Sequence, residues 1–238
     1  MEPRGQEVRP VRFCGTGFIF AGGLLVTCRH CVDKPVASPN YLAGAVELAS
    51  GRYKAERLTN ICFESTGMDI ATARVDADDS PLLLGVNIPG IGQEVGAFGY
   101  PGTYGRLPDG QITGDMSFAQ EERWLEGYVT RAFSYSVPTG EIRPSWEIDM
   151  PTPGGLSGAP LFHLRTQAPA GSGVVIGMCY GRHLAHGEPD AGGMSLPGYV
   201  FGLAHYYKSL RDARFHTLGN ATLGAYLEGH GAIFDMSQ

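Results

Sequence analysis

The chain has 238 residues, of which 43% are hydrophobic and 18% are charged, a composition typical of a folded globular protein with a sizeable core. The net charge is −6 and no basic run stands out, which argues against a nucleic-acid partner. No apolar stretch approaches the roughly 18 residues that a membrane span requires. The polar N-terminus lacks the apolar core of a signal peptide, so we expect a cytoplasmic protein that does not bind membranes.

Glycine (35 residues) and proline (16 residues) are abundant, which favours many short strands joined by tight turns. In the first part of the chain, apolar or alternating runs bounded by turn residues predict strands over 11–20, 24–27, 45–49, 53–58, 60–63 and 70–75. In the second part, the same signals predict strands over 94–100, 129–133, 145–150, 160–163, 174–181 and 199–204. Apolar residues at helical spacing then predict a helix over 205–215.

Residues 151–160, Pro-Thr-Pro-Gly-Gly-Leu-Ser-Gly-Ala-Pro, place one serine, Ser157, directly before an apolar run. A serine hydroxyl is a weak nucleophile, so it needs a neighbouring base and donors aimed at the developing oxyanion. Glycines on either side would let the backbone turn sharply, expose the hydroxyl and point N–H groups inward. Taken alone, however, the stretch is more often an ordinary turn-rich loop.

Two upstream residues supply the partners that such a serine needs, a histidine as base and a carboxylate that fixes the histidine tautomer. His30 lies in Thr27-Cys-Arg-His-Cys31, and Asp69 opens the apolar run 70–75. Read singly, His30 is a structural histidine beside cysteines and Asp69 is a strand cap. Their occurrence in one chain with Ser157 favours a catalytic triad instead.

These three motifs, in the order His, Asp, Ser, resemble those of the chymotrypsin-like (trypsin-fold) serine proteases. Residues 27–31 resemble the family's Thr-Ala-Ala-His-Cys, and Asp69-Ile-Ala resembles its Asp-Ile-Ala. Residues 155–160 resemble its Gly-Asp-Ser-Gly-Gly-Pro, in a form that is closest to bacterial members and shares features with the 3C-like serine proteases of some RNA viruses. The resemblance covers about residues 11–210.

The resemblance implies an all-β fold of two six-stranded antiparallel Greek-key β-barrels with a C-terminal helix. The N-terminal barrel would span residues 11–92 and carry His30 and Asp69. The C-terminal barrel would begin at residue 93, carry Ser157 and extend with the helix and tail to residue 238.

The resemblance also implies a serine endopeptidase without a cofactor, acting on a protein or peptide substrate through an acyl-enzyme intermediate. Ser157 would be the nucleophile, His30 the general base and then acid, and Asp69 the group that orients His30. The backbone N–H groups of Gly155 and Ser157 would form the oxyanion hole. We expect such an enzyme to process specific protein targets in a bacterial cell.

Two other functions stay open at this point. The chain could be a catalytically silent trypsin-fold module that binds a partner protein, although an intact triad argues against silence. It could also be a viral 3C-like polyprotein protease, although a free-standing chain that starts at Met argues against that function.

One departure from the family concerns activation. Digestive members carry Asp directly before the serine, where it captures a new N-terminus after zymogen cleavage, and here that residue is Leu156. We therefore expect constitutive activity or control by a regulatory protein partner.

A second departure concerns specificity. We expect Thr152, Cys179, Tyr180 and Gly181 to contact the substrate. The floor of the family's pocket falls at Pro151, which offers no counter-ion for Lys or Arg, and Cys179 stands where 3C-like enzymes have the histidine that reads glutamine. A small or apolar residue before the cleaved bond is the preference that remains.

The cysteines are an odd set with no clear zinc spacing: Cys14, Cys28, Cys31, Cys62 and Cys179. Cys28-Arg-His-Cys31 offers possible ligands, but no second ligand pair follows at metal spacing, so the sequence predicts no metal site. The resemblance places Cys14 and Cys31 where the family has a bridged pair. In a reducing cytosol we expect both to be thiols.

Overall fold

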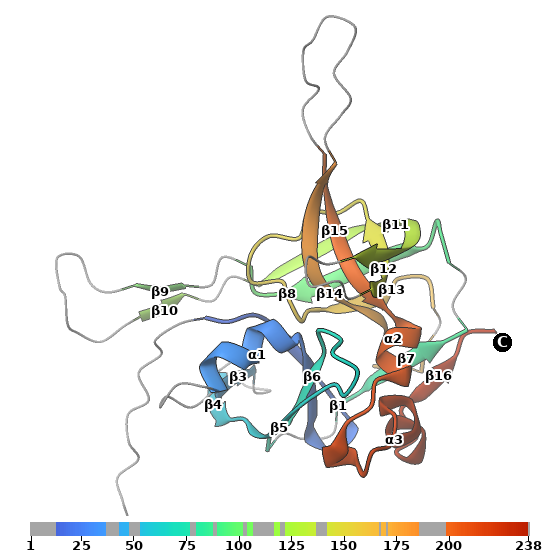
Figure 1. The fold of residues 1–238 in the computed structure, drawn as a ribbon. Coiled ribbons are helices and arrows are strands. Elements are labelled where there is room, and N and C mark those ends of the chain that lie inside the picture. The colour runs from blue at the N-terminus through green and yellow to red at the C-terminus, as the bar shows by residue number, and fades with distance from the viewer. Residues whose placement is uncertain are drawn as a thin grey trace, which may run out of the picture.

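The structure is a computed structural model that describes residues 13–36, 43–47, 53–76, 80–87, 90–101, 104–106, 117–119, 122–136, 142–166, 168–169, 171–185 and 199–237. Within these ranges the chain is mostly β, with a few short helices (Figure 1). None of the described helices is long and apolar enough to cross a membrane.

The N-terminal half contains a four-stranded antiparallel sheet in the order β1 (Gly17–Phe20), β2 (Leu24–Thr27), β6 (Ala71–Arg74) and β5 (Thr59–Phe63). The 3-10 turn η1 (Ala21–Gly23) joins β1 to β2. Helix α1 (Arg29–Val36) starts two residues after β2 ends. A separate hairpin consists of β3 (Ala43–Glu47) and β4 (Tyr53–Arg57).

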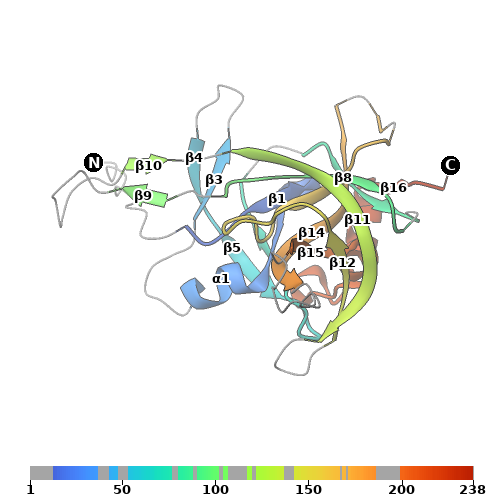
Figure 2. The same cartoon turned by 90° about the horizontal axis from the view of Figure 1, so that it is seen from above.

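The C-terminal half contains a closed ring of six antiparallel strands. In ring order they are β13 (Pro160–His163), β8 (Glu94–Gly99), β11 (Arg123–Ser136), β12 (Ile142–Ile148), β15 (Tyr199–Tyr206) and β14 (Gly173–Ala185). Because β13 pairs with both β8 and β14, this ring has no free edge. Figure 2 shows the long β11 of this ring curving along one side of the molecule.

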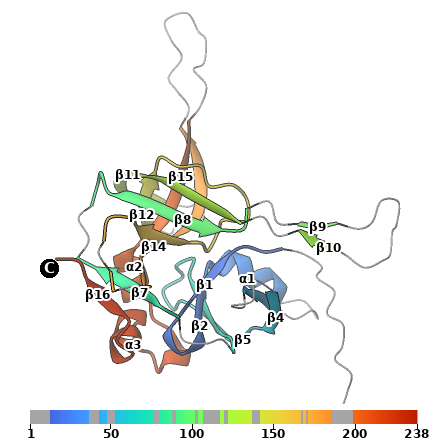
Figure 3. The ribbon, with the colours of Figure 1, turned by 180° about the vertical axis from the view of Figure 1, so that it is seen from behind.

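Strand β7 (Leu82–Val86) joins the two halves, because it pairs in parallel with β14 and with β16 (Ile233–Asp235) near the C-terminus (Figure 3). Helices α2 (Tyr207–Asp212) and α3 (Leu223–Gly229), with the turn η2 (His216–Leu218) between them, pack beside these strands. Strands β9 (Tyr104–Arg106) and β10 (Ser117–Ala119) form a small separate ribbon.

Buried apolar side chains form two large clusters. The first spans both halves, because it joins the N-terminal sheet to α2, α3 and one face of β14, and it includes Phe20, Leu24 and Leu210. The second fills the C-terminal ring and includes Ile148 and Leu161. Strand alternation explains this division, since every second side chain of a strand points to the same face of its sheet.

The mostly-β prediction is confirmed, and the predicted strands 24–27 and 160–163 have the same bounds as β2 and β13. The predicted six-stranded first barrel is not confirmed, because its described strands form a four-stranded sheet and a separate hairpin. Strand β7 pairs with the C-terminal half instead. Its consecutive leucines suit a parallel strand that is covered on both faces, a pairing that sequence alone does not specify.

The predicted helix over 205–215 is shorter in the structure, where β15 continues to Tyr206 and α2 occupies only Tyr207–Asp212. Helix α1 was not predicted. Its sequence, Arg-His-Cys-Val-Asp-Lys-Pro-Val, is short and carries no clear apolar stripe, so its helical signal is weak.

Candidate active site

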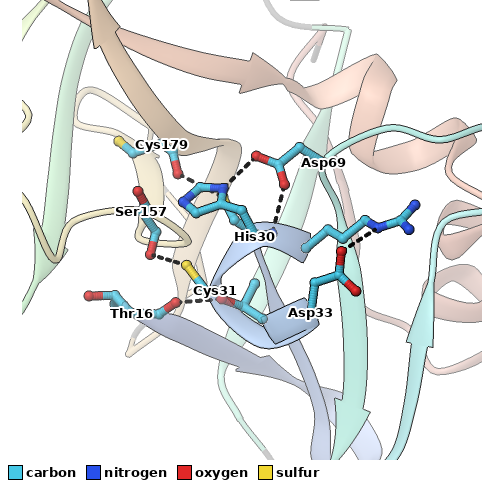
Figure 4. Close-up of polar contacts among 10 residues, drawn as sticks. Thr16, His30, Cys31, Asp33, Asp69, Ser157 and Cys179 are labelled. Carbon is cyan, nitrogen blue, oxygen red and sulfur yellow. Dashed lines mark hydrogen bonds and ion pairs between the residues drawn. The ribbon is translucent and has the colours of Figure 1, made fainter. Parts of the chain in front are cut away.

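His30 and Asp69 form a tightly hydrogen-bonded pair at the start of α1. The Nδ1 atom of His30 lies 2.7 Å from Oδ2 of Asp69, and the backbone N–H of His30 donates to Oδ1 of Asp69 over 2.9 Å. The first contact holds the imidazole against the carboxylate, and the second ties the backbone of His30 to the same carboxylate, as Figure 4 shows. Asp69 is only 5% exposed, whereas the side chain of His30 is 48% exposed and reaches solvent.

This pairing shifts both pKa values. The hydrogen bond to Asp69, with a smaller contribution from Cys31, raises the pKa of His30 from 6.5 to about 10 and outweighs the lowering effect of partial burial. Burial by itself would raise the pKa of the Asp69 carboxyl. The hydrogen bonds and charge of His30, with a further contribution from His205, nevertheless hold the Asp69 pKa below its ordinary value.

Ser157 lies in a tight turn between β12 and β13 whose shape depends on glycine. Gly155 has φ +98° and Gly158 has φ +86°, a left-handed region that favours residues without a side chain. The backbone N–H of Leu156 donates to the Pro153 carbonyl over 3.2 Å, and that of Ala159 donates to the Leu156 carbonyl over 2.9 Å. These bonds fold the segment back on itself around Ser157.

Thr16, just before β1, holds this turn from the opposite half of the molecule. Its backbone N–H donates to the Ser157 carbonyl over 2.8 Å, and its hydroxyl donates to the Gly155 carbonyl over 2.8 Å. The Thr27 hydroxyl at the end of β2 donates to the Thr16 carbonyl over 2.6 Å. The same strand that leads into the His30 helix therefore also supports the serine turn.

The imidazole of His30 lies between the Asp69 carboxylate and Ser157 in Figure 4. In the described part of the chain, the Ser157 hydroxyl makes no hydrogen bond to the imidazole, a separation that often closes only when a substrate binds. Likewise, no acceptor among the described residues takes the backbone N–H of Gly155 or of Ser157. The structure thus brings together the three residues that the sequence singled out, with two backbone donors next to the serine.

The four predicted substrate-contact residues lie on the two segments beside this turn. The Thr152 hydroxyl donates to the Gly181 carbonyl over 2.7 Å, which links the segments directly. The Cys179 carbonyl accepts from the backbone N–H of Gly158 over 2.7 Å, but its thiol is buried, and this burial raises its pKa to about 12. Tyr180 is also buried, with its hydroxyl 2.6 Å from that of Ser145. Gly181 is the most exposed of the four.

Three residues near the site carried no clear signal in the sequence. Thr16 follows an irregular segment, and its role depends on a hydrogen bond to Gly155, which lies 139 residues later in the chain. His205 is fully buried near the end of β15 and packs against Tyr180, with the two rings tilted by 33° and their centroids 4.4 Å apart. Cys28 is fully buried directly before α1, and its thiol donates to the Cys179 carbonyl over 3.3 Å.

All five cysteines are free thiols, Cys14 and Cys31 included. Cys31 lies against the serine turn, with its sulfur 3.6 Å from the Ser157 carbonyl oxygen. A hydrogen bond from Cys28 and another from His30 lower the pKa of Cys31 to about 6, although its burial acts in the opposite direction.

Comparison with known proteins agrees with this geometry. A family model described as a trypsin-like peptidase domain matches residues 15–178, well over half of the chain. The chain belongs to this family. A search of curated protein sequences finds no significant match.

Solved structures show the same fold at low sequence identity. A serine-to-alanine mutant of Rv3671c from M. tuberculosis H37Rv, in its inactive form, is 19% identical over 90% of this chain and 82% of that chain, with a TM-score of 0.54. The Rv3671c protease in its inactive form is 20% identical over 92% of this chain and 84% of that chain, with a TM-score of 0.53. The HtrA-type protease AlgW with a decapeptide is 18% identical over 82% of this chain but only 48% of that chain, with a TM-score of 0.51.

A side chain at position 158 should disrupt the serine turn. A Cβ atom on Gly158 would lie 2.1 Å from the Thr16 carbonyl oxygen and 2.4 Å from the Thr27 hydroxyl, and the backbone there is left-handed. We expect Gly158→Ala to lower the free energy of unfolding by about 2–5 kcal/mol, measured by denaturant titration. Gly154→Ala is the matched control, because its Cβ would meet no atom within 4 Å, and it should change stability by less than about 0.5 kcal/mol. Equal effects of the two variants would contradict this account of the turn.

The His30–Asp69 contact should be visible in a titration of the imidazole by NMR. We expect the midpoint near 10 in the wild-type chain, and in Asp69→Asn a midpoint shifted toward the ordinary 6.5. Because folding raises the pKa of His30, its contribution to stability is fully present below pH 6.5 and is lost as the pH rises toward 10. A wild-type midpoint at or below 6.5 would show that the contact does not hold in solution.

Proposed function

We propose that the chain is a serine endopeptidase that hydrolyses peptide bonds through Ser157, His30 and Asp69. The observation that carries the proposal is the 2.7 Å contact between Nδ1 of His30 and the buried Asp69, with Ser157 on the other side of the imidazole (Figure 4). This is the order of groups that activates a serine hydroxyl. Membership of the trypsin-like peptidase domain family supports it.

In the proposed reaction, Oγ of Ser157 attacks the carbonyl carbon of the scissile bond while Nε2 of His30 takes its proton. Asp69 keeps the Nδ1 proton in place and stabilises the imidazolium. The backbone N–H groups of Gly155 and Ser157 donate to the oxyanion. His30 then protonates the leaving amine, and water attacks the acyl-enzyme by the reverse sequence of proton transfers. The mechanism needs neutral His30, so we expect turnover to increase as the pH rises toward 10.

The proposed site would lie where the two halves meet, since His30 and Asp69 come from the N-terminal half and Ser157, which accepts from Thr16, comes from the C-terminal half. This position is the one that the two-barrel Greek-key architecture implies, and we propose that architecture for the whole chain, with the boundary near residue 92. A bacterial source, a cytoplasmic location and control by a regulatory protein partner stay predictions, as does the absence of nucleic-acid and membrane partners.

For specificity, we propose a small or apolar residue before the cleaved bond. The Thr152–Gly181 hydrogen bond links the two segments that would line the pocket, a contact that favours a small pocket. Met150 is fully buried and Pro151 carries no charge, so neither would bind a Lys or Arg side chain. The proposed targets are particular proteins rather than any unfolded chain.

Labelling with a fluorophosphonate probe tests the proposal, because the probe reacts with activated serines. We expect the wild-type chain to label, and Ser157→Ala and His30→Ala to lose at least about a thousandfold in labelling rate. Ser237→Ala and His230→Ala serve as controls, since both residues are exposed and lie near the C-terminus, away from the proposed triad. A wild-type chain that stays unlabelled, including in lysate of the source cell, would favour the silent binding module over the peptidase.

A peptide-library cleavage profile tests the specificity. We expect small or apolar residues before the cleaved bond in the wild-type chain. Thr152→Ala removes the hydroxyl that bridges to Gly181, so it should admit larger residues, whereas Thr152→Ser keeps the hydroxyl and should retain the wild-type profile. A strict requirement for Lys, Arg or Gln in the wild type would contradict the proposed pocket.

A further inference from the structure

Cys28 brings a third potential metal ligand to the His30–Asp69 pair. The Cys28 sulfur, one ring nitrogen of His30 and one carboxylate oxygen of Asp69 all lie within 4.8 Å of one another. Cys28 and Asp69 are buried, whereas His30 is half exposed, so the group is anchored on two sides and reaches solvent on the third. In the family motif that residues 27–31 resemble, alanine stands in place of Cys28. The thiol is therefore a feature of this chain.

We propose that Cys28, His30 and Asp69 bind a Zn²⁺ ion, and that the bound ion blocks catalysis. Thiolate sulfur, imidazole nitrogen and carboxylate oxygen are the three ligand types that Zn²⁺ takes in proteins. Three protein ligands with the fourth position left to water form a common open zinc site. The prediction of no metal site rested on the lack of a second cysteine or histidine pair in sequence, whereas here the third ligand is Asp69, brought in by the fold.

The geometry requires only a small adjustment. Tetrahedral Zn²⁺ with ligand distances of about 2.0–2.3 Å separates its ligand atoms by about 3.4–3.6 Å. Ligand atoms as far apart as 4.8 Å would have to approach by about 1.2–1.4 Å, whereas Nδ1 of His30 and Oδ2 of Asp69, now 2.7 Å apart, would have to separate by about 0.7–0.9 Å to bind the same ion. The imidazole of His30 can make this movement, because its side chain is 48% exposed.

The surroundings of the other two ligands would hold them in place. The backbone N–H of His30 donates to Oδ1 of Asp69 over 2.9 Å, and Oδ2, which now lies 2.7 Å from Nδ1 of His30, would exchange that hydrogen bond for the metal. The Cys28 thiol points at the Cys179 carbonyl, 3.3 Å away, and would release its proton to solvent on binding the ion. Such second contacts orient metal ligands and are part of a functional metal site.

A bound ion would prevent His30 from acting as the general base. Whichever ring nitrogen of His30 binds Zn²⁺, the imidazole can no longer both accept the Ser157 proton and donate to Asp69. Free zinc would thereby control the enzyme through the catalytic residues themselves. This inhibition rests on the proposed peptidase function, whereas zinc binding does not.

Binding is tested first without catalysis, in the full Ser157→Ala chain under reducing conditions. Co²⁺ replaces Zn²⁺ as a spectroscopic probe, because a cobalt–thiolate bond gives a charge-transfer band in the near ultraviolet. We expect this band at one equivalent of Co²⁺ and its loss when Zn²⁺ is added. Competition with a chromogenic chelator then gives the Zn²⁺ affinity.

Variants of the same chain assign the ligands. Cys28→Ala should abolish the band and weaken Zn²⁺ binding at least about tenfold, and Asp69→Asn should weaken it about 10- to 100-fold. Cys62→Ala is the matched control, a buried thiol outside the group, and should keep both the band and the affinity. Absence of a band, or a band that survives in Cys28→Ala and disappears in Cys31→Ala or Cys62→Ala, would overturn the assignment.

Inhibition is tested in the chain with Ser157 intact, by fluorophosphonate labelling with and without Zn²⁺, each variant being compared with its own zinc-free rate. Zinc should slow labelling of the wild type at least tenfold, and a chelator should restore it, whereas Cys28→Ala should resist the same zinc concentration. Equal inhibition of both chains would show that zinc acts through His30 alone and would overturn the proposal. A wild type that binds Co²⁺ yet never labels would refute the peptidase function and leave the metal site standing.

Discussion

The contact between Thr16 and the serine turn is the one on which the arrangement of the site depends. The backbone N–H and the hydroxyl of Thr16 donate to the carbonyls of Ser157 and Gly155, each over 2.8 Å. A turn with left-handed glycines has few intrinsic preferences that would fix it in space, so bonds from another element must do so. Because Thr16 is also bonded to Thr27 at the end of β2, the turn is placed relative to the strand that leads into α1 and His30.

Asp69 imposes the second constraint, since a buried carboxylate is tolerated only where charge and hydrogen bonds compensate its lost hydration. The ring and the backbone N–H of His30 supply both hydrogen bonds, and the charge of His205 adds to them. The carboxylate is consequently rigid, while the half-exposed imidazole keeps some freedom to move. A general base needs this combination, because it must hold one tautomer while its other nitrogen exchanges protons with Ser157 and with the leaving group.

The features that could be predicted from the sequence are those that depend on residues close together in the chain or on recognisable motifs. Strands 24–27 and 160–163 were predicted with their bounds because short apolar runs there follow glycine-rich segments. The pairing of β7 with β14, the role of Thr16 and the place of His205 could not be predicted, since each depends on contacts between residues far apart in the chain. His30, Asp69 and Ser157 were found only through their motifs, and the structure adds how they lie relative to one another.

Cys28 shows how one residue can change what such a site does. A buried free cysteine usually behaves as a small apolar side chain, and at 0% exposure packing alone could account for Cys28. The residues around Cys28 favour another role, because a ring nitrogen of His30 and a carboxylate oxygen of Asp69 lie within 4.8 Å of its sulfur and make its surroundings polar. The features that make His30 a good base, a half-exposed ring and a nearby buried carboxylate, also make it a good metal ligand once a thiol is added. Since proton transfer and metal binding need the same imidazole, the two states exclude each other, and metal binding would act directly on the chemical step without any change of fold.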